Sequence, residues 1–290
     1  MRGRQHEVYA QLFQWNYSTL ATSLVATIDT PGFRSTGPVG VSVSASQRAV
    51  SSHPVRLTND FRHWRRQVRL VQRAIVGGAE TTSNFDPPAW EASDTPVPGV
   101  SSVFHEATGA WLHAVRAANG QIWLVAWRTS SAWSNPVNTG IRSFATPSIT
   151  CSPNKCFLAY VEVPTPLASG STQTRLQWSE GTVAWPTGGN LSFTHSGVTT
   201  SWYNVVSDPV ASVVRNPAGG WYYYVSTSWP TFSGGAWGTR VLTYRRSENS
   251  TGAGALIQMT PLLAHSPGIA VQPTTAVTGT CAELFTSRSP

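Results

Sequence analysis

The chain has 290 residues, of which 40% are hydrophobic and only 11% charged, and it contains 24 glycines, 20 prolines and 13 tryptophans. This composition favours short strands joined by turns over helices, and the absence of any run of 18 apolar residues excludes a transmembrane helix. The net charge is +7, but Lys155 is the only lysine and much of the arginine excess lies between residues 48 and 73, so the charge does not indicate a nucleic-acid-binding protein.

The first predicted strand is GVSVSAS after Pro38, where small apolar and polar residues alternate as in a half-buried strand. The next segment, Asn59 to Val76, allows two interpretations. Its apolar residues have helical spacing behind an Asn59 and Asp60 cap, which would make a basic amphipathic helix. Alternatively, LTNDFRHW is a turn and QVRLVQRAIV a pair of strands, and the repeat described next favours strands.

Four later segments share one pattern: a proline, an alternating apolar strand, a turn with Gly or Asn, and an aromatic strand. They start near Pro96, Pro147, Pro209 and Pro273, at separations of 51, 62 and 64 residues. Pro38 lies one period earlier, so the chain holds five starts about 59 residues apart. QIWLVAW, TRLQW and TRVLTYRR add further strands, which is typical of the four-stranded blades of a β-propeller.

The two ends of the chain complement each other in length, because 18 residues run from Pro273 to Pro290 and 37 precede Pro38. We therefore expect an all-β protein whose residues 1–290 form a single β-propeller of five four-stranded blades. In this hypothesis N- and C-terminal strands share the last blade, with residues 274–285 paired to a strand from the first 37. A β-sandwich with accidental spacing is the alternative.

Cys151 and Cys156 flank Ser-Pro-Asn-Lys, a turn-forming sequence that places two adjacent strands side by side. The spacing predicts a hairpin disulfide with the two Cα atoms within about 7 Å. A disulfide indicates an oxidising compartment, so we expect a secreted or cell-surface protein. Cys281 is interpreted as a buried small hydrophobic residue.

The segment SDPVASVVRNPAGGWYYYVS, from Ser207, resembles the inner hairpin of five-bladed propeller glycosidases of the arabinanase, xylosidase and invertase type. WSEGTVAW, from Trp178, resembles a degraded Asp-box of sialidase propellers, and AWSNP around Trp133 is similar to the Trp-Ser segments of propeller lectins. The resemblance implies a propeller fold and, for the glycosidases, two Asp and one Glu at the mouth of a central funnel.

That resemblance implies Asp94 and Asp208 as catalytic candidates, at matching positions two units apart and near one end of the ring axis. Glu162 is the candidate acid, with Glu106 and Glu180 as alternatives. The family's consecutive pattern is broken, because Thr146 precedes the intermediate Pro147. An Asp before Pro can also fix a turn through its own side chain, which would make Asp94 and Asp208 structural.

Aromatic residues are the other functional signal, because an exposed indole offers a flat apolar face to a sugar ring while neighbouring polar groups bind hydroxyls. Five tryptophans stand beside Gly, Ser or Asn in predicted turns: Trp133, Trp185, Trp202, Trp229 and Trp237. The first functional hypothesis is therefore a secreted, lectin-like protein whose partner is a glycan, with Trp133, Trp185 and Trp237 as its main contacts.

The second hypothesis is a glycoside hydrolase, and the third is a protein-interaction platform with residues 48–73 as its charged face. The sequence contains no cluster with metal-ligand spacing and indicates no cofactor, although calcium in the axial channel stays open. The identity of the sugar and the oligomeric state are also open.

Overall fold

The computed structural model describes the backbone over 19 stretches of the chain. These are residues 7–16, 21–34, 40–43, 48–60, 63–74, 80–85, 100–117, 119–128, 133–166, 172–187, 189–203, 205, 207–216, 218–233, 236–250, 252, 254–259, 267–271 and 282–286. All regular secondary structure in these residues is β-strand.

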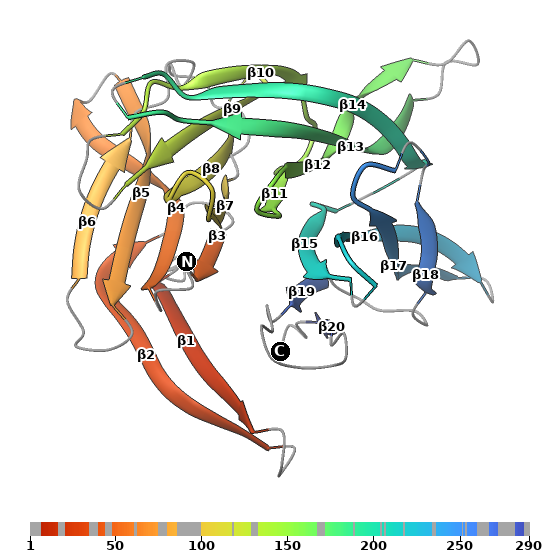
Figure 1. Cartoon of the computed structure of the whole chain (residues 1–290), viewed down its shortest axis with the longest axis horizontal. Coiled ribbons are helices and arrows are strands. Elements are labelled where there is room, and N and C mark those ends of the chain that lie inside the picture. Colours follow the sequence, from red (N-terminus) through yellow and green to blue (C-terminus); the bar gives the residue numbers. More distant parts are fainter. Residues whose placement is uncertain are drawn as a thin grey trace.

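The strands form six antiparallel sheets, four with four strands and two with two (Figure 1). One small sheet pairs β1 (Glu7–Asn16) with β2 (Ala21–Arg34). The first large sheet contains β3 (Gly40–Val43), β4 (Arg48–Asp60), β5 (His63–Ala74) and β6 (Glu80–Phe85). The second contains β7 (Val100–His105), β8 (Ala110–Arg116), β9 (Gln121–Trp127) and β10 (Val137–Arg142).

The third large sheet contains β11 (Ser148–Cys151), β12 (Cys156–Pro166), β13 (Thr172–Ala184) and β14 (Ser192–Tyr203). The fourth contains β15 (Val210–Arg215), β16 (Trp221–Ser233), β17 (Ala236–Ser247) and β18 (Ala255–Met259). The second small sheet pairs β19 (Pro267–Val271) with β20 (Ala282–Thr286). Within each large sheet, strands adjacent in sequence are neighbours, so each sheet is built from successive hairpins.

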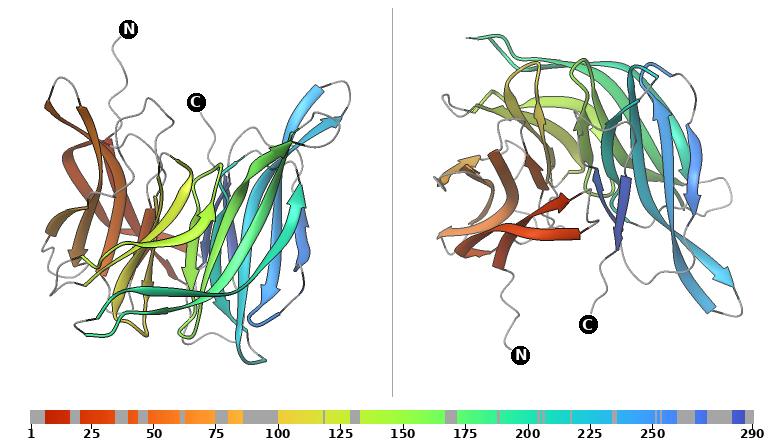
Figure 2. Two further views of the ribbon diagram at one scale, coloured as in Figure 1. Left: turned by 90° about the horizontal axis from the view of Figure 1, so that it is seen from above. Right: turned by 60° about the horizontal axis from the view of Figure 1, so that its bottom comes forward.

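The large sheets follow one another around a common centre, with their first strands innermost (Figures 1 and 2). Serine side chains join these first strands directly. Ser101 Oγ on β7 accepts a hydrogen bond from the N–H of Ile149 on β11, at 3.0 Å. Ser148 Oγ on β11 accepts one from the N–H of Ala211 on β15, at 2.9 Å. An all-β chain of antiparallel four-stranded sheets arranged in this way is consistent with a β-propeller.

The structure decides between the two interpretations of the segment from Asn59 to Val76. Its described residues belong to the hairpin of β4 and β5, with Asp60 opposite His63, so the preference for a turn and strands is confirmed over the helix. The detail of two strands after the turn is wrong, because residues 63–74 form one continuous strand.

The chain ends differ from the expectation. β20 pairs with β19, and β1 pairs with β2, so the described strands of the two ends do not share a sheet. Residues 274–281 lie outside the described residues. The expectation was wrong because the lengths of the two chain ends do not show that the C-terminal strand has a partner close by. β19 begins at Pro267, six residues before Pro273, and makes a local hairpin with β20.

The core consists of apolar side chains between the faces of neighbouring sheets. In β12, Leu158 and Tyr160 belong to the cluster shared with the β7–β10 sheet, and Phe157 and Val161 to the cluster shared with the β15–β18 sheet. This strand is buried on both faces, which explains its continuous apolar run. The Phe157 ring stacks on that of Tyr223 from β16, with centroids 4.6 Å apart.

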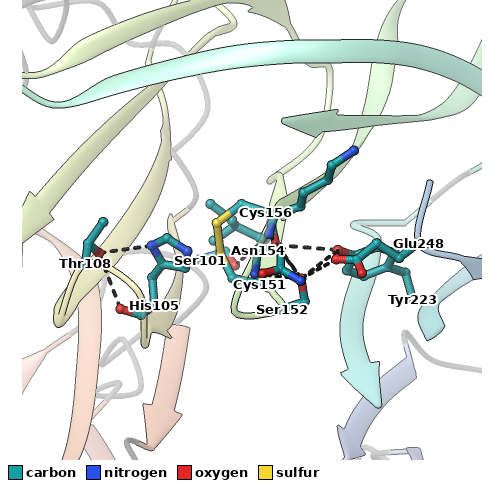
Figure 3. The surroundings of a disulfide bond; sticks show 11 residues. Ser101, His105, Thr108, Cys151, Ser152, Asn154, Cys156, Tyr223 and Glu248 are labelled. Carbon is teal, nitrogen blue, oxygen red and sulfur yellow. Dashed lines mark hydrogen bonds between the residues drawn. A yellow bond between two sulfur atoms is a disulfide. The ribbon is translucent and has the colours of Figure 1, made fainter. Parts of the chain in front are cut away.

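The strands of the large sheets run between two ends of the molecule, called below the Phe144 end and the disulfide end after a feature found at each. At the Phe144 end, the chain passes from one large sheet to the next through residues 143–147 and through a second connection whose described residues are 205 and 207–209. At the disulfide end, β11 turns into β12 between Cys151 and Cys156 (Figure 3). These cysteines are bonded, with their Cα atoms 4.0 Å apart and directly opposite in the register, so the predicted hairpin disulfide is confirmed.

Candidate functional site

The segment from Ser143 to Thr146 lies at the Phe144 end, between β10 and β11, and each of its four backbone N–H groups donates a hydrogen bond. The pairs are Ser143 N–H to the Gly120 carbonyl (2.8 Å), Phe144 N–H to the Val161 carbonyl (2.7 Å), Ala145 N–H to Ser143 Oγ (3.2 Å) and Thr146 N–H to Asp208 Oδ1 (2.9 Å). The acceptors come from three successive sheets and their connections. A segment with every N–H bonded is held in one conformation, which makes it a rigid platform.

Two charged side chains hold this platform. Arg116, at the end of β8, donates from Nε to the carbonyl of Ser143 at 2.8 Å. Burial lowers the pKa of Arg116, and the negative charge of Asp208 opposes that shift, which indicates that the two groups lie close enough to interact. Asp208 is half-buried and uses Oδ1 for Thr146, so it fixes the start of the preceding sheet rather than its own.

Glu162 reaches the same segment from β12. It forms a backbone bridge with Ser143 and stands opposite Arg175 of β13 in the register. Gln177 Nε2 donates to Glu162 Oε2 at 2.7 Å, and Arg175 Nη1 lies 4.0 Å from the same oxygen. The Glu162 side chain is 36% exposed, so its carboxylate is both anchored and open to solvent.

Phe144 stands out from the platform, with 58% of its surface exposed. Among residues whose burial the structure describes, the other exposed large hydrophobic residues are Leu256 and Ile257 on β18, so Phe144 is the one exposed aromatic ring of that part of the chain. Isolated exposed hydrophobic residues are common. This ring is distinctive because its neighbours on the platform bond the Asp208 carboxylate and the Arg116 guanidinium, and Ser143 forms a backbone bridge with Glu162.

This arrangement suits the recognition of a polyol. A phenyl face packs against C–H groups, while carboxylate oxygens accept hydrogen bonds from hydroxyls and guanidinium groups donate to ring and hydroxyl oxygens. The backbone N–H groups of the platform are already bonded within the protein, so the platform offers a ligand side chains and not backbone donors.

The structure brings together two of the three catalytic candidates. Asp208 contacts the platform through its carboxylate and Glu162 through its backbone, whereas Asp94 lies outside the described residues. Of the alternatives, Glu106 is exposed in the turn after β7, and Glu180 is 3% exposed and bound to Lys155 and Arg246 at the disulfide end. Neither belongs to the site at the Phe144 end.

The candidate tryptophans divide between the two ends. Trp133 and Trp185 follow β9 and β13 at the disulfide end, away from the platform. Trp185 is buried at 8% exposure with the Arg128 guanidinium over its ring at 4.2 Å, which corrects the expectation of an exposed indole. Trp133 is half-buried and packs beside His113 and Trp127. The Gly, Ser and Asn residues beside these tryptophans in the sequence do not show which side chains from other segments pack against the indoles.

The other three tryptophans occupy strands that extend toward the Phe144 end. Trp202 is opposite Leu176 in β13, and Trp237 is opposite Phe232 in the hairpin of β16 and β17; their side chains lie outside the described part of the structure. Trp229 is half-buried and packs against the core between the third and fourth sheets. The strand positions therefore place Trp202, Trp229 and Trp237 toward the Phe144 end, and Trp133 and Trp185 toward the disulfide end.

Within the described residues, no group of three or more His, Cys, Asp or Glu side chains is arranged to hold a metal ion. The described part of the chain also contains no helix that is long and apolar enough to cross a membrane.

Comparison with known proteins gives only distant similarities. No family model matches the chain, and no curated protein does. Among solved structures, an α-L-arabinofuranosidase from Fusarium graminearum, in complex with an iminosugar inhibitor, is 10% identical with a TM-score of 0.48, over 98% of this chain and 80% of the other. A triple arginine-to-alanine mutant of AofleA from Arthrobotrys oligospora is 8% identical with a TM-score of 0.38, over 78% and 72% of the two chains. These values assign the chain neither a family nor an activity.

Three residues of the site, Phe144, Arg116 and Gln177, were not predicted from the sequence. Phe144 and Arg116 carry no local motif, and they meet only because β8 and the 143–146 segment adjoin in space. Gln177 had a signal, since the alternation of Arg175, Leu176 and Gln177 puts the two polar residues on one face of a strand.

Proposed function

We propose that this protein binds carbohydrate at the Phe144 end, through Phe144, Glu162, Arg116 and Asp208. The observation that carries the proposal is an exposed aromatic ring on a rigid segment that accepts a hydrogen bond from the Arg116 guanidinium, donates one to the Asp208 carboxylate and forms a backbone bridge with Glu162. The proposed contacts therefore lie at this end and not at Trp133 and Trp185, and the strands that carry Trp202, Trp229 and Trp237 extend toward the same end.

The wider proposal is a secreted or cell-surface, single-domain, five-bladed β-propeller spanning residues 1–290, with blades starting near residues 38, 96, 147 and 209 and a last blade that includes the hairpin of β19 and β20. The disulfide supports an extracytoplasmic location, because such bonds persist in oxidising compartments. The partner is a glycan or polysaccharide, and binding requires no cofactor; calcium in an axial channel is a separate question for metal analysis of the purified protein.

A glycan array followed by calorimetry with the strongest glycan tests the proposal. We expect Phe144→Ala to weaken binding roughly 3- to 10-fold, the loss of one ring contact. Glu162→Gln should weaken it about tenfold or more, because an acceptor carboxylate becomes a neutral amide. Both side chains are substantially exposed, so neither change should lower the unfolding temperature appreciably.

Matched controls come from outside the site. Glu106→Gln makes the same chemical change at the disulfide end, and Leu256→Ala removes another exposed apolar side chain. Both should bind like the wild type. A wild-type protein that binds no glycan on the array, or site variants that bind as well as these controls, would overturn the proposal.

Glycoside hydrolysis is the second candidate, favoured by the fact that Asp208 and Glu162 both bond the same four-residue segment, Asp208 through its carboxylate and Glu162 through its backbone. Hydrolysis uses two carboxyl groups, one to protonate the leaving oxygen and one to activate water or attack carbon. Asp94 is the third carboxyl group proposed for this role. A panel of chromogenic glycosides tests it: turnover that disappears in Glu162→Gln and in Asp208→Asn supports a hydrolase, and binding without turnover supports a lectin-like protein.

A further inference from the structure

The hairpin of β12 and β13 carries four polar side chains on one face. In the register Tyr160 is directly opposite Gln177, and Glu162 is directly opposite Arg175. The residues between them, Val161 and Leu176, point to the other face and belong to the core beneath the β15–β18 sheet. Two cross-strand pairs therefore form a row that runs from the core to the Phe144 end.

Two hydrogen bonds connect this row. Tyr160, which is 4% exposed, donates from its hydroxyl to Gln177 Oε1 at 3.0 Å. Gln177, which is 8% exposed, donates from Nε2 to Glu162 Oε2 at 2.7 Å. The directions follow from chemistry: an ionised carboxylate only accepts, so the amide NH₂ faces Glu162, and the amide oxygen left over must accept from Tyr160.

A buried amide and hydroxyl are costly unless bonded, and an apolar pair of similar size would fill the same space without that requirement. The buried pair of Tyr160 and Gln177 also contacts a group outside the core, because Gln177 donates a hydrogen bond to the half-exposed Glu162. That bond occupies Oε2, which Arg175 also approaches. No described residue donates a hydrogen bond to Oε1.

We propose that Gln177, held by Tyr160, is a positioning residue that fixes the Glu162 carboxylate so that Oε1 is presented to a hydroxyl group of the glycan. The inference deepens the proposed carbohydrate binding and rests on it. Gln177 does not touch the ligand. It restricts the Glu162 side chain before the ligand binds, so that less side-chain entropy is lost on binding.

The first experiment needs no ligand. In protein labelled with ¹⁵N at glutamine, the Gln177 side-chain signal is identified by its absence in Gln177→Leu. Its NH₂ protons should exchange slowly with solvent in the wild type and much faster in Glu162→Ala. Equal exchange in the two proteins would overturn the positioning role, whatever the ligand of the protein is.

The second experiment is a double-mutant cycle on affinity for the strongest glycan from the array. Gln177→Leu should weaken binding about tenfold in the wild-type background and less than about twofold in a Glu162→Gln background, because it acts only through Glu162. A purely structural role predicts equal losses in both backgrounds and would refute the inference. If Gln177→Leu fails to fold, the double variant Tyr160→Phe/Gln177→Leu, which leaves no buried partner unpaired, replaces it in the cycle.

The two experiments separate the inference from the proposed function. A protein that binds no glycan but shows the Glu162-dependent exchange of Gln177 contradicts carbohydrate binding and not the positioning of Glu162. A protein whose binding depends on Glu162 but not on Gln177 supports carbohydrate binding and refutes the positioning role.

Discussion

His113 on β8 is completely buried, and its environment makes it sensitive to acid. Its Nδ1 shares a hydrogen bond of 2.8 Å with Ser102 Oγ, and Nε2 has no partner among the described residues. Burial lowers the pKa of His113 from 6.5 to about 3, since the charged imidazolium would lose its hydration. The native protein therefore keeps His113 neutral at a pH where the unfolded chain protonates it.

We predict that His113 makes the protein less stable in acid. The folded-state pKa lies below the unfolded-state value, so this contribution is complete above about pH 6.5 and is lost as the pH falls toward 3. Well inside this pH range, protonation of His113 in the unfolded chain should lower the free energy of unfolding by about 1.4 kcal/mol for each unit by which the pH falls. Urea denaturation at several pH values measures the slope.

The matched variant for this prediction is His113→Gln, which cannot gain a proton. Its stability should depend less on pH than that of the wild type between pH 4 and 6, although its stability at pH 7 is lower. Identical slopes for the two proteins would show that His113 does not titrate differently on unfolding. His105, whose pKa burial also lowers, contributes in the same direction and is unchanged in the comparison.

At the same scale, the candidate site was predictable only in part. Asp208 and Glu162 could be selected because their residue types and their positions beside strands are visible in the sequence. The burial of Trp185 could not, since the indole belongs to the apolar cluster shared by the second and third large sheets, and Arg128, 57 residues earlier in the chain, lies over it. A turn sequence predicts a local conformation and not what another segment places on top of it.

Among the elements, the hairpin of β11 and β12 shows how a short turn joins two sheets (Figure 3). Ser152 Oγ accepts hydrogen bonds from the N–H groups of Asn154 and Lys155 within the turn. The same hydroxyl donates to Glu248 in the turn after β17, and the Tyr223 hydroxyl donates to the same carboxylate at 3.2 Å. The disulfide thus closes a turn that is also a contact between neighbouring sheets.

Removing the disulfide with Cys151→Ser/Cys156→Ser should lower the free energy of unfolding by about 2 kcal/mol, the entropy of a short closed loop. Thermal unfolding with and without reductant measures the effect. Reductant should destabilise the wild type and leave the double variant unchanged, and Cys281→Ser serves as the control that keeps the bond. Equal stability of the wild type with and without reductant contradicts the prediction.

The elements differ in how far sequence could predict them. First strands after Pro38, Pro96, Pro147 and Pro209 were predictable because each follows a turn residue and alternates in hydrophobicity. The partner of the C-terminal strand was not, because strand composition shows that a strand needs a partner without showing which one it takes. A nearby hairpin closes with less loss of chain entropy than a pairing across the whole chain, and β20 pairs with β19.

At the scale of the whole molecule, a buried ion pair connects the third and fourth sheets. Glu180 of β13 lies 3.3 Å from Arg246 of β17, and both side chains are almost completely buried. Glu180 also accepts from the N–H of Asn249 at 3.1 Å and lies 3.5 Å from the Lys155 ammonium. Apolar contacts such as those of Phe157 with Tyr223 complete this junction, so charge and packing act together.

Breaking this pair should destabilise the protein more than replacing it. Glu180→Gln leaves the Arg246 guanidinium buried without its counter-charge and should cost about 3 kcal/mol or more of unfolding free energy. The double variant Glu180→Leu/Arg246→Met removes both charges and should recover most of that loss. Chemical denaturation of both proteins provides the comparison, and a double variant weaker than the single one would contradict the prediction.

The hydrogen bonds of the 143–146 segment have a consequence for proteolysis. An exposed phenylalanine in a connection between strands resembles a preferred cleavage site for a chymotrypsin-like enzyme, but such an enzyme needs several residues free of their own partners to bind them as an extended chain. Here the N–H groups around Phe144 are bonded to three successive sheets. Cleavage beside Phe144 therefore requires the junctions between these sheets to open first. In the folded protein the ring is exposed to solvent, but the peptide bond next to it is protected from the protease.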